Sequence, residues 1–275
     1  MTEGNTAPPE RIREMFDRIA GVYDGMNGLI SGFQEPRWRR RVVREAGLGP
    51  GMRALDVACG TGKVAADLRD AVSPGGAVVG LDVSTRMIER AQARFAREGL
   101  TFVVGDALAL PVEDATFDAA TIAFGMRNLA DYRRGFAEMG RAVRPGGRVV
   151  CLEIARPRRR LGRLVASWFD HVVPLIGRLV GQGGAYAYLV RSVRAYPSPE
   201  RIAEIMTEAG LTEVRWFGLS GGIVTIHTGI RGSADTADTA DAAVLPRPAL
   251  TGTSIHYRPV AGRPSSMLGA RGLEP

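Results

Sequence analysis

The sequence predicts an α/β fold of the doubly wound type, with a seven-stranded, mostly parallel sheet that ends in an antiparallel hairpin. Between residues 53 and 230, short apolar runs alternate with amphipathic stretches of helical period. Such alternation is typical of strands and helices that wind around a parallel sheet. The last two apolar runs are joined by only a short glycine-rich segment, and so short a connection favours an antiparallel pair.

Five strands and three helices are expected in the first part of this pattern. The strands are expected at residues 53–58, 77–82, 101–106, 117–124 and 147–154. The helices are expected in the gaps, at residues 62–71, 84–98 and 131–143. Ser84 can cap the second helix, and the sequence RPGG at 144–147 supplies the proline and glycines that end the third.

The segment after the fifth strand breaks the alternation. Residues 160–195 have helical character, and a further helix is expected between Ser198, as its N-cap, and Gly210. The sequences EVRWFG and GGIVTIHTGI follow as two strands, joined through LSGG. Because the insertion interrupts the sheet pattern, we expect residues 156–195 to form much of a substrate pocket.

Length and composition indicate one domain with flexible ends. A chain of 275 residues, 45% of them hydrophobic, can bury one sizeable core. The tail opens with the repeat ADTADTADAA and has too little apolar surface to offset its chain entropy. We expect a flexible N-terminus at 1–10, a domain at 11–231 that starts with a helical lid at 11–50, and a disordered tail at 232–275.

Charge and cysteine content narrow the possible partners. The net charge of +7 permits an anionic partner, but no nucleic-acid-binding motif accompanies it. Two distant cysteines and three scattered histidines offer no metal-ligand spacing. There is no signal peptide and no run of about 18 apolar residues, so we expect a soluble cytoplasmic protein without a metal.

Arginines precede an apolar, aromatic stretch within residues 156–180. This combination suits peripheral contact with an anionic membrane surface. A solvated helix face over an ordinary core explains the pattern equally well, so the sequence leaves both interpretations open.

The sequence LDVACGTGKVA at 55–65 predicts a strand, a glycine turn and a helix. Its portion GTGKVA fits the dinucleotide pattern, with Asp82 about 20 residues further on for a ribose. Asp56 fits a different ligand, because a carboxylate at the strand end suits a positively charged group better than a pyrophosphate. S-adenosylmethionine carries an ammonium and a sulfonium, and we favour this cofactor over a nicotinamide.

Two acids follow at the carboxyl ends of the next strands, where ligands bind in open α/β sheets. Asp82 can accept hydrogen bonds from both ribose hydroxyls. Asp106, followed by Ala107, can accept one from the adenine amino group. The other cofactor contacts are expected at residues around these motifs: Ala58, Gly60, Thr61, Gly62, Val83, Met87 and Ala123.

The sequence AFGMRN at 123–128 ends a predicted buried strand with a guanidinium and an amide. Such groups cost free energy at a strand mouth unless something pairs with them, so this stretch predicts a ligand. A structural ion pair of Arg127 with Asp82 or Asp106 is the alternative explanation.

Together these motifs resemble the family of S-adenosylmethionine-dependent quinone-ring C-methyltransferases of ubiquinone and menaquinone biosynthesis. The resemblance runs from about Phe16 to Arg231. It is carried by VYDGMNGLIS, LDVACGTG, GLDVS, ALPVEDATFD, FGMRN, RAVRPGGRVVCLE, YAYLVRSVRAYP and GGIVTIHTG. It implies a Rossmann-like, class I methyltransferase fold and C-methylation of a polyprenyl quinol, with demethylmenaquinol as the first choice.

The resemblance also implies roles for residues that would contact the substrate. Tyr23 and Asn27 would close over it from the N-terminal lid. A phenol ionises with a pKa of roughly 10, so the site must favour the phenolate at neutral pH. Arg127 would stabilise that developing charge, and Asn128 would orient the quinol oxygen.

The general base is less clearly indicated. Asp24 and His171 are candidates, and a water held by Arg127 is an equally good one. The chain also departs from the family at three positions: Glu35 stands in place of a histidine, and Ala123 and Ala155 in place of serines. The first departure puts a proton-relay role at that position in doubt.

Other functions are compatible with parts of the sequence. A nicotinamide-linked oxidoreductase is supported only by GTGKVA. A catalytically silent quinol-binding subunit would not need three cofactor acids. Within the enzyme interpretation, another phenolic or lipid-like substrate is the alternative. The oligomeric state stays open, with a homodimer as one option.

Overall fold

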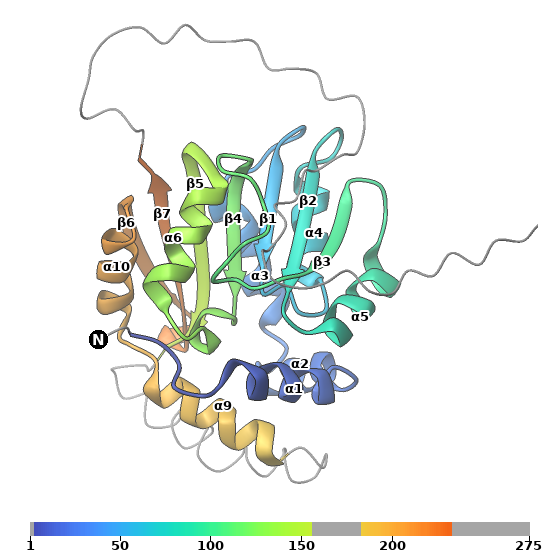
Figure 1. Ribbon diagram of the computed structural model, residues 1–275, viewed down its shortest axis with the longest axis vertical. Coiled ribbons are helices and arrows are strands. Elements are labelled where there is room, and N and C mark those ends of the chain that lie inside the picture. Colours follow the sequence, from blue (N-terminus) through green and yellow to red (C-terminus); the bar gives the residue numbers. More distant parts are fainter. Residues whose placement is uncertain (1–2, 156–182, 233–275) are drawn as a thin grey trace, which may run out of the picture.

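A seven-stranded sheet with the order β3-β2-β1-β4-β5-β7-β6 forms the centre of the structure (Figure 1). The computed structural model describes residues 3–155 and 183–232. Neighbours from β3 to β5 pair in parallel, whereas β7 pairs antiparallel with both β5 and β6. The predicted fold class is therefore confirmed, including the terminal hairpin, whose second strand lies inside the sheet.

The strands lie close to their predicted ranges. They are β1 (Arg53–Val57), β2 (Ala77–Asp82), β3 (Leu100–Val104), β4 (Phe117–Ala123), β5 (Val143–Ile154), β6 (Leu211–Leu219) and β7 (Val224–Arg231). The largest difference from the prediction is at β5, which begins at Val143, directly after helix α6, and includes the RPGG sequence that was expected to precede the strand. Val143 already pairs with Phe117, and a register shift accommodates the residues that follow it.

The helices also follow the predicted pattern. They are α1 (Pro9–Ile19), α2 (Tyr23–Ile30), α3 (Glu35–Ala46), α4 (Lys63–Ala71), α5 (Thr85–Phe95), α6 (Tyr132–Ala142), α9 (Gly183–Ala195) and α10 (Pro199–Glu208), with the short 3-10 turns η1 (Met126–Asn128) and η3 (Ser220–Gly222). The two predicted N-caps are present, because Ser84 accepts from Met87 N and Ser198 accepts from Arg201 N.

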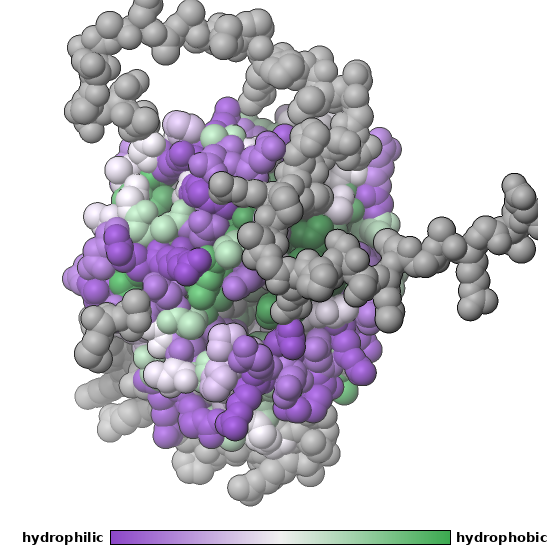
Figure 2. Space-filling model, viewed as in Figure 1, coloured by the Kyte–Doolittle hydropathy of each residue, from purple (hydrophilic) through white to green (hydrophobic). Residues whose placement is uncertain are grey.

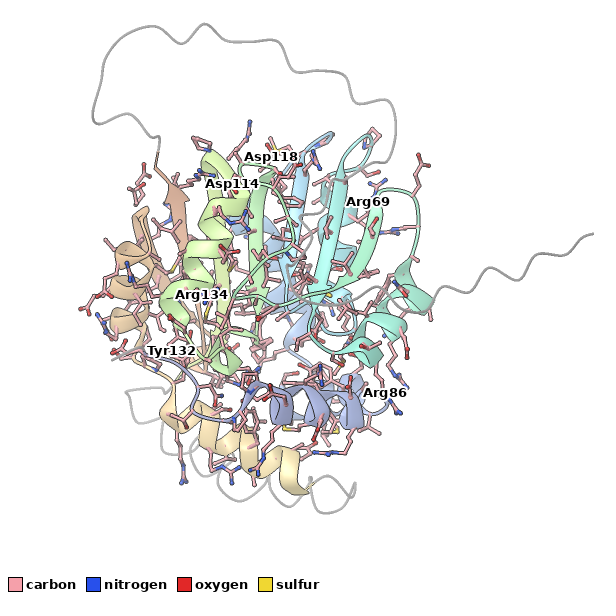
Figure 3. All side chains as sticks on the ribbon, viewed as in Figure 1. Arg69, Arg86, Asp114, Asp118, Tyr132 and Arg134 are labelled. Carbon is pink, nitrogen blue, oxygen red and sulfur yellow. The ribbon has the colours of Figure 1, made fainter. Side chains whose placement is uncertain are left out.

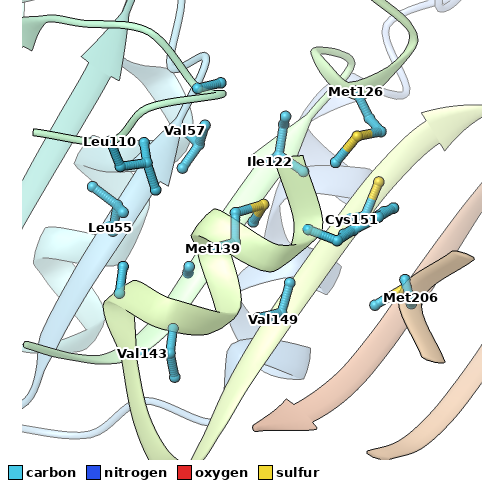
Figure 4. Packing of buried hydrophobic residues seen from close by; sticks show 14 of the residues in the cluster. Leu55, Val57, Leu110, Ile122, Met126, Met139, Val143, Val149, Cys151 and Met206 are labelled. Atoms are coloured by element: carbon cyan, nitrogen blue, oxygen red, sulfur yellow. The ribbon is translucent and has the colours of Figure 1, made fainter. Parts of the chain in front are cut away.

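Two hydrophobic clusters cover the two faces of the sheet. Successive strand residues point to opposite faces, so Val149 and Cys151 pack under α6 and α10 whereas Val150 and Leu152 pack under α3 and α4. Figure 4 shows the first cluster, where Met139 of α6 packs over the sheet. Because both faces of the sheet are buried, the sequences of the central strands are continuous apolar runs.

Helices α1, α2 and α9 lie across one end of the sheet (Figure 1). The chain before α1 is tied to the same end, because Asn5 N donates to Leu129 O at 2.7 Å and Tyr132 N donates to Glu3 O at 3.0 Å. The sequence predicts a flexible segment at 1–10, and these bonds show that residues 3–5 are held in place. The predicted domain limits stay a prediction, and the predicted tail beyond residue 232 lies outside the described residues.

Hydrophilic residues cover most of the face seen in Figure 2, with hydrophobic residues in small groups between them. Among the described helices, none is both long and apolar enough to cross a membrane. The predicted membrane-contact segment at 156–180 lies outside the described residues.

Candidate active site

Two adjoining cavities lie where the carboxyl ends of the strands meet the helices across the end of the sheet. The larger has a volume of about 430 Å³ and the smaller about 140 Å³. They share a wall made by six residues: Phe16, Tyr23, Ala58, Gly60, Ala123 and Phe124. The two cavities are therefore immediate neighbours.

The turn after β1 forms part of the shared wall. Ala58, Gly60 and Gly62 all have left-handed backbone conformations, with φ of 51°, 55° and 83°. A Cβ on Gly62 would lie 2.8 Å from the ring of Phe102, so this position requires glycine. The turn lines both cavities at Ala58 and Gly60 and leads directly into α4.

The smaller cavity gathers most of the predicted cofactor residues. Asp82 is buried at the end of β2, and its two oxygens accept from Gly60 N and Ser84 N, both at 2.9 Å. Burial raises the pKa of Asp82. Asp106 is exposed and accepts from Leu108 N. Other predicted residues complete the lining: Ala58, Gly60, Val83, Met87, Ala107 and Ala123.

Asp56 occupies a different place from the one predicted. Its side chain is buried between strands and lines neither cavity. Oδ1 accepts from Thr121 Oγ1 at 2.7 Å, whereas Oδ2 is buried without a hydrogen-bond partner among the described residues. Burial raises the pKa of Asp56 to about 7. Direct contact with a cofactor ammonium does not follow from this position.

The larger cavity is walled mainly by apolar side chains from α2, α3 and α9. These include Met26, Ile30, Trp38, Tyr186 and Leu189. Thr61 lines it from the turn after β1, Lys63 from the start of α4 and Arg127 from η1. The cavity therefore suits an apolar ligand with one polar end.

Arg127 forms a buried ion pair, but with neither of the predicted partners. Its Nη1 donates to Glu153 Oε1 at 2.8 Å and also to Phe124 O, and its backbone N donates to Glu153 Oε2. Burial acts to lower the pKa of Arg127, but Glu153 together with Tyr23 and Tyr188 more than offsets this, so the pKa is raised. Nε is buried and has no hydrogen-bond partner among the described residues.

Asn128 belongs to a three-residue network that joins three parts of the chain. Tyr188 Oη donates to Asn128 Oδ1 at 2.9 Å, and Asn5 Nδ2 donates to Tyr188 Oη at 2.6 Å. Asn5 also donates to the carbonyl of Arg127. Asn128 lines the smaller cavity and Tyr188 the larger one, so Asn128 is not among the residues that line the cavity expected to hold the quinol.

Asp24 of α2 contacts the turn after β1, the start of α4 and helix α5. Its Oδ1 accepts from Thr61 Oγ1 at 2.8 Å and lies 3.1 Å from Lys63 Nζ, while Oδ2 lies 2.8 Å from Arg94 Nη1. Lys63 also lies 3.3 Å from Glu35 Oε2, so it bridges α2 and α3. A carboxylate with three donors is poorly placed to take a proton, which argues against Asp24 as the base.

Tyr23 is the predicted lid residue that reaches both cavities. It packs edge-on against Phe16 and lies over Gly60. Burial raises the pKa of Tyr23, so its hydroxyl stays protonated and can donate a hydrogen bond. Asn27 lines the larger cavity as predicted. His171 lies outside the described residues.

Several site residues were not singled out from the sequence. Glu153 and Tyr188 both lie inside motifs that carry the family resemblance. The sequence therefore marked their positions but did not indicate what either side chain does. Lys63 is the only lysine in the chain, and that composition was the available signal. Asn5 lies in a segment expected to be flexible, and nothing in its surroundings pointed to it.

The profile of the ubiE/COQ5 methyltransferase family matches residues 5–231. The chain belongs to the ubiE/COQ5 methyltransferase family. A demethylmenaquinone methyltransferase of Staphylococcus aureus (strain JH9) is 38% identical over 235 residues, which cover 84% of this chain and 98% of the relative. Membership of a methyltransferase family excludes the nicotinamide-linked alternative.

Solved structures share the fold of this ubiE/COQ5 family member at low sequence identity. A SAM-dependent methyltransferase from Thermotoga maritima has a TM-score of 0.56 at 20% identity, covering 80% of this chain and 99% of that one. Phosphoethanolamine N-methyltransferase 2 of Haemonchus contortus, in complex with S-adenosyl-L-methionine, has a TM-score of 0.55 at 16% identity, covering 72% of this chain and 53% of that one. Such similarity confirms the class I methyltransferase fold.

Proposed function

We propose that this enzyme transfers a methyl group from S-adenosylmethionine to a ring carbon of a polyprenyl quinol, with demethylmenaquinol as the main substrate. The observation that carries the proposal is the wall shared by the two cavities. A smaller cavity that contains two acids adjoins a larger, mainly apolar one, and methyl transfer requires two ligands in neighbouring sites. The name of the Staphylococcus aureus relative supports the choice of quinol.

The residues around the smaller cavity fit the cofactor. Asp82 would accept hydrogen bonds from the ribose hydroxyls and Asp106 from the adenine amino group, while the methionine end would lie along the turn at Gly60 and Thr61. The cofactor supplies an electrophilic methyl group. Asp56, with its unpartnered oxygen behind the turn, would act on the cofactor only through the turn or a water.

The chain's own residues would prepare the quinol ring for attack. The Arg127 guanidinium, held by Glu153, would favour loss of the quinol proton by stabilising the phenolate oxygen. Tyr23 would donate a hydrogen bond to the same ligand because its hydroxyl stays protonated. With Asp24 engaged by three donors, water beside Arg127 is the proposed proton acceptor. The lid helices would exclude bulk solvent, which strengthens these interactions.

The test is methyl transfer from labelled S-adenosylmethionine to reduced demethylmenaquinol and, in parallel, to the corresponding benzoquinol. Label in the naphthoquinol supports the proposal, and label in both indicates a dual-pathway enzyme. Thermal protection by adenosylhomocysteine is measured on the same protein. If adenosylhomocysteine protects but neither quinol is labelled, the cofactor assignment stands and the substrate assignment is wrong.

Tyr23→Phe separates the proposed lid role from cofactor binding. The variant should bind adenosylhomocysteine as the unchanged enzyme does, because the ring remains over Gly60, and should turn over more slowly. A loss of cofactor affinity in calorimetry would count against this role.

A further inference from the structure

Exposed apolar residues flank the cavity-lining face of α2. They are Val22, Leu29 and Phe33, whose exposed fractions are 43%, 45% and 73%. Three of the six exposed large hydrophobic residues in the described part of the chain therefore lie within twelve positions. We call these three residues the α2 edge.

The adjoining face of α2 lines the larger cavity through Met26, Asn27 and Ile30. The residues on either side of Phe33, Gly32 and Gln34, line the same cavity. The helix therefore separates the cavity from the outside. Some of its large apolar side chains face solvent and not the cavity, and these exposed side chains need an explanation.

Charge is nearly absent from this part of the lid. Between residues 19 and 33 the only charged residue is Asp24, whose carboxylate is taken up by Thr61, Lys63 and Arg94. Exposed arginines begin just outside this range, with Arg18 before it and Arg37 after it. Asp17 and Glu35 also flank the range, but Asp17 accepts from Ser84 Oγ and Glu35 is paired with Arg39 and Lys63. The α2 edge is thus an uncharged strip with an exposed arginine before and after it in the chain.

Phe33 is held in this exposed position by a strained backbone. Its φ is +60°, a left-handed conformation that costs a bulky residue on the order of 1 kcal/mol. Its N–H donates to Gly28 O at 2.8 Å, which closes the end of α2. Glycine would satisfy this backbone without strain, so the aromatic ring in solvent is not required by the turn itself.

We propose that the α2 edge docks on the surface of an anionic lipid bilayer and brings the larger cavity against it. The inference rests on the proposed function, because a polyprenyl quinol must be drawn from a bilayer. Apolar side chains enter the acyl boundary, and flanking arginines attract anionic headgroups with about 1 kcal/mol each. Three side chains are too few for a protein partner, since stable interfaces bury about 800 Å² on each side.

The experiment measures co-sedimentation of the full chain with vesicles that contain one part phosphatidylglycerol to about two parts phosphatidylcholine, without substrate. The double variant Leu29→Ser/Phe33→Ser should bind these vesicles roughly tenfold more weakly than the unchanged chain, since it loses two inserting side chains. The matched control is Trp216→Ser, an exposed aromatic residue on the edge strand β6, which should bind as the unchanged chain does.

A second measurement separates this proposal from the proposed function. The double variant should methylate a short-tailed, water-dispersed quinol at the unchanged rate and a vesicle-embedded quinol more slowly. Equal vesicle binding by the double variant and the unchanged chain overturns the docking surface, whatever the outcome of the methyl-transfer assay. A dimer in sedimentation equilibrium that the double variant dissociates also overturns it, because a second copy would then occupy the edge.

Discussion

Arg127 Nη1 and Glu153 Oε1 lie 2.8 Å apart in an ion pair whose side chains are 7% and 0% exposed. Removing one partner of such a pair leaves a buried charge uncompensated, which typically costs about 3–5 kcal/mol of stability. A loss of activity in Arg127→Leu would therefore mix a structural effect with a catalytic one. The pair offers a way to separate them.

We expect Arg127→Leu to lower both the free energy of unfolding and methyl transfer, and Arg127→Leu/Glu153→Leu to recover most of the stability without recovering turnover. Turnover in the double variant should stay at least 100-fold low, on the scale of a lost charge-stabilising group. Denaturant unfolding, turnover and adenosylhomocysteine affinity are measured together. Asp114→Asn, in a pair with Arg141 at the other end of the sheet (Figure 3), is the control. Recovered turnover, or an equal loss of cofactor affinity, would show that Arg127 is structural.

Tyr188→Phe should lower turnover several-fold with little change in fold, because it removes the hydroxyl that links Asn5 to Asn128. Tyr196→Phe, directly after the same helix, is the matched control. The Tyr196 hydroxyl is buried without a hydrogen-bond partner among the described residues and lines neither cavity, so its removal should be neutral or slightly stabilising. Equal turnover in the two variants would mean that the network does not position the site.

Lys63→Met should raise the KM for the quinol more than it lowers kcat. Lys63, at the start of α4, forms ion pairs with Asp24 of α2 and Glu35 of α3. Its loss leaves two neighbouring carboxylates that repel each other. Lys63→Arg keeps the charge and should recover most of the affinity for the quinol. If both variants behave alike, charge at this position does not hold the lid.

Asp56→Asn should change the pH dependence of stability in the absence of cofactor. The pKa of Asp56 is raised from 3.8 to about 7 by burial, so the folded chain keeps a proton that the unfolded chain has lost between those values. This contribution to stability is complete at low pH and is lost as the pH rises through about 7. The variant should gain stability relative to the unchanged chain as the pH rises from 5 to about 7, by roughly 3 kcal/mol, and the difference should stay level from there to pH 8. A constant difference from pH 5 to about 7, measured by denaturant unfolding, would contradict the assignment.

The sheet was predictable because each strand is short, apolar and bounded by a strong signal, such as the glycine turn after Val57 or the cap at Ser84. Sequence periodicity also placed Asp82 and Asp106 at strand ends, and the structure brings both to one cavity. The order of the last two strands could not be derived in this way, because the sequence of a hairpin looks the same whichever of its two strands pairs with β5.

Side-chain partners were the part that sequence could not supply. Glu153 lies 26 residues from Arg127, and only the pairing of β4 with β5 brings the two together. Asn5 and Tyr188 are 183 positions apart and meet through the folding of the lid over the sheet. Asp56 was predicted at the end of a strand, and it lies there, but the sequence could not show that its side chain points between the strands and away from the cavities.

The chain contains 36 basic residues, and the sequence shows that only Lys63 among them is a lysine. An amine-reactive label can therefore modify this side chain and the N-terminal amine but none of the arginines. The Lys63 side chain is 18% exposed and lies between two carboxylates, so a reagent reaches it fully only when α2 and α3 move away from α4. The rate of labelling at this single position would report, by mass spectrometry on the unmutated enzyme, how often the lid opens.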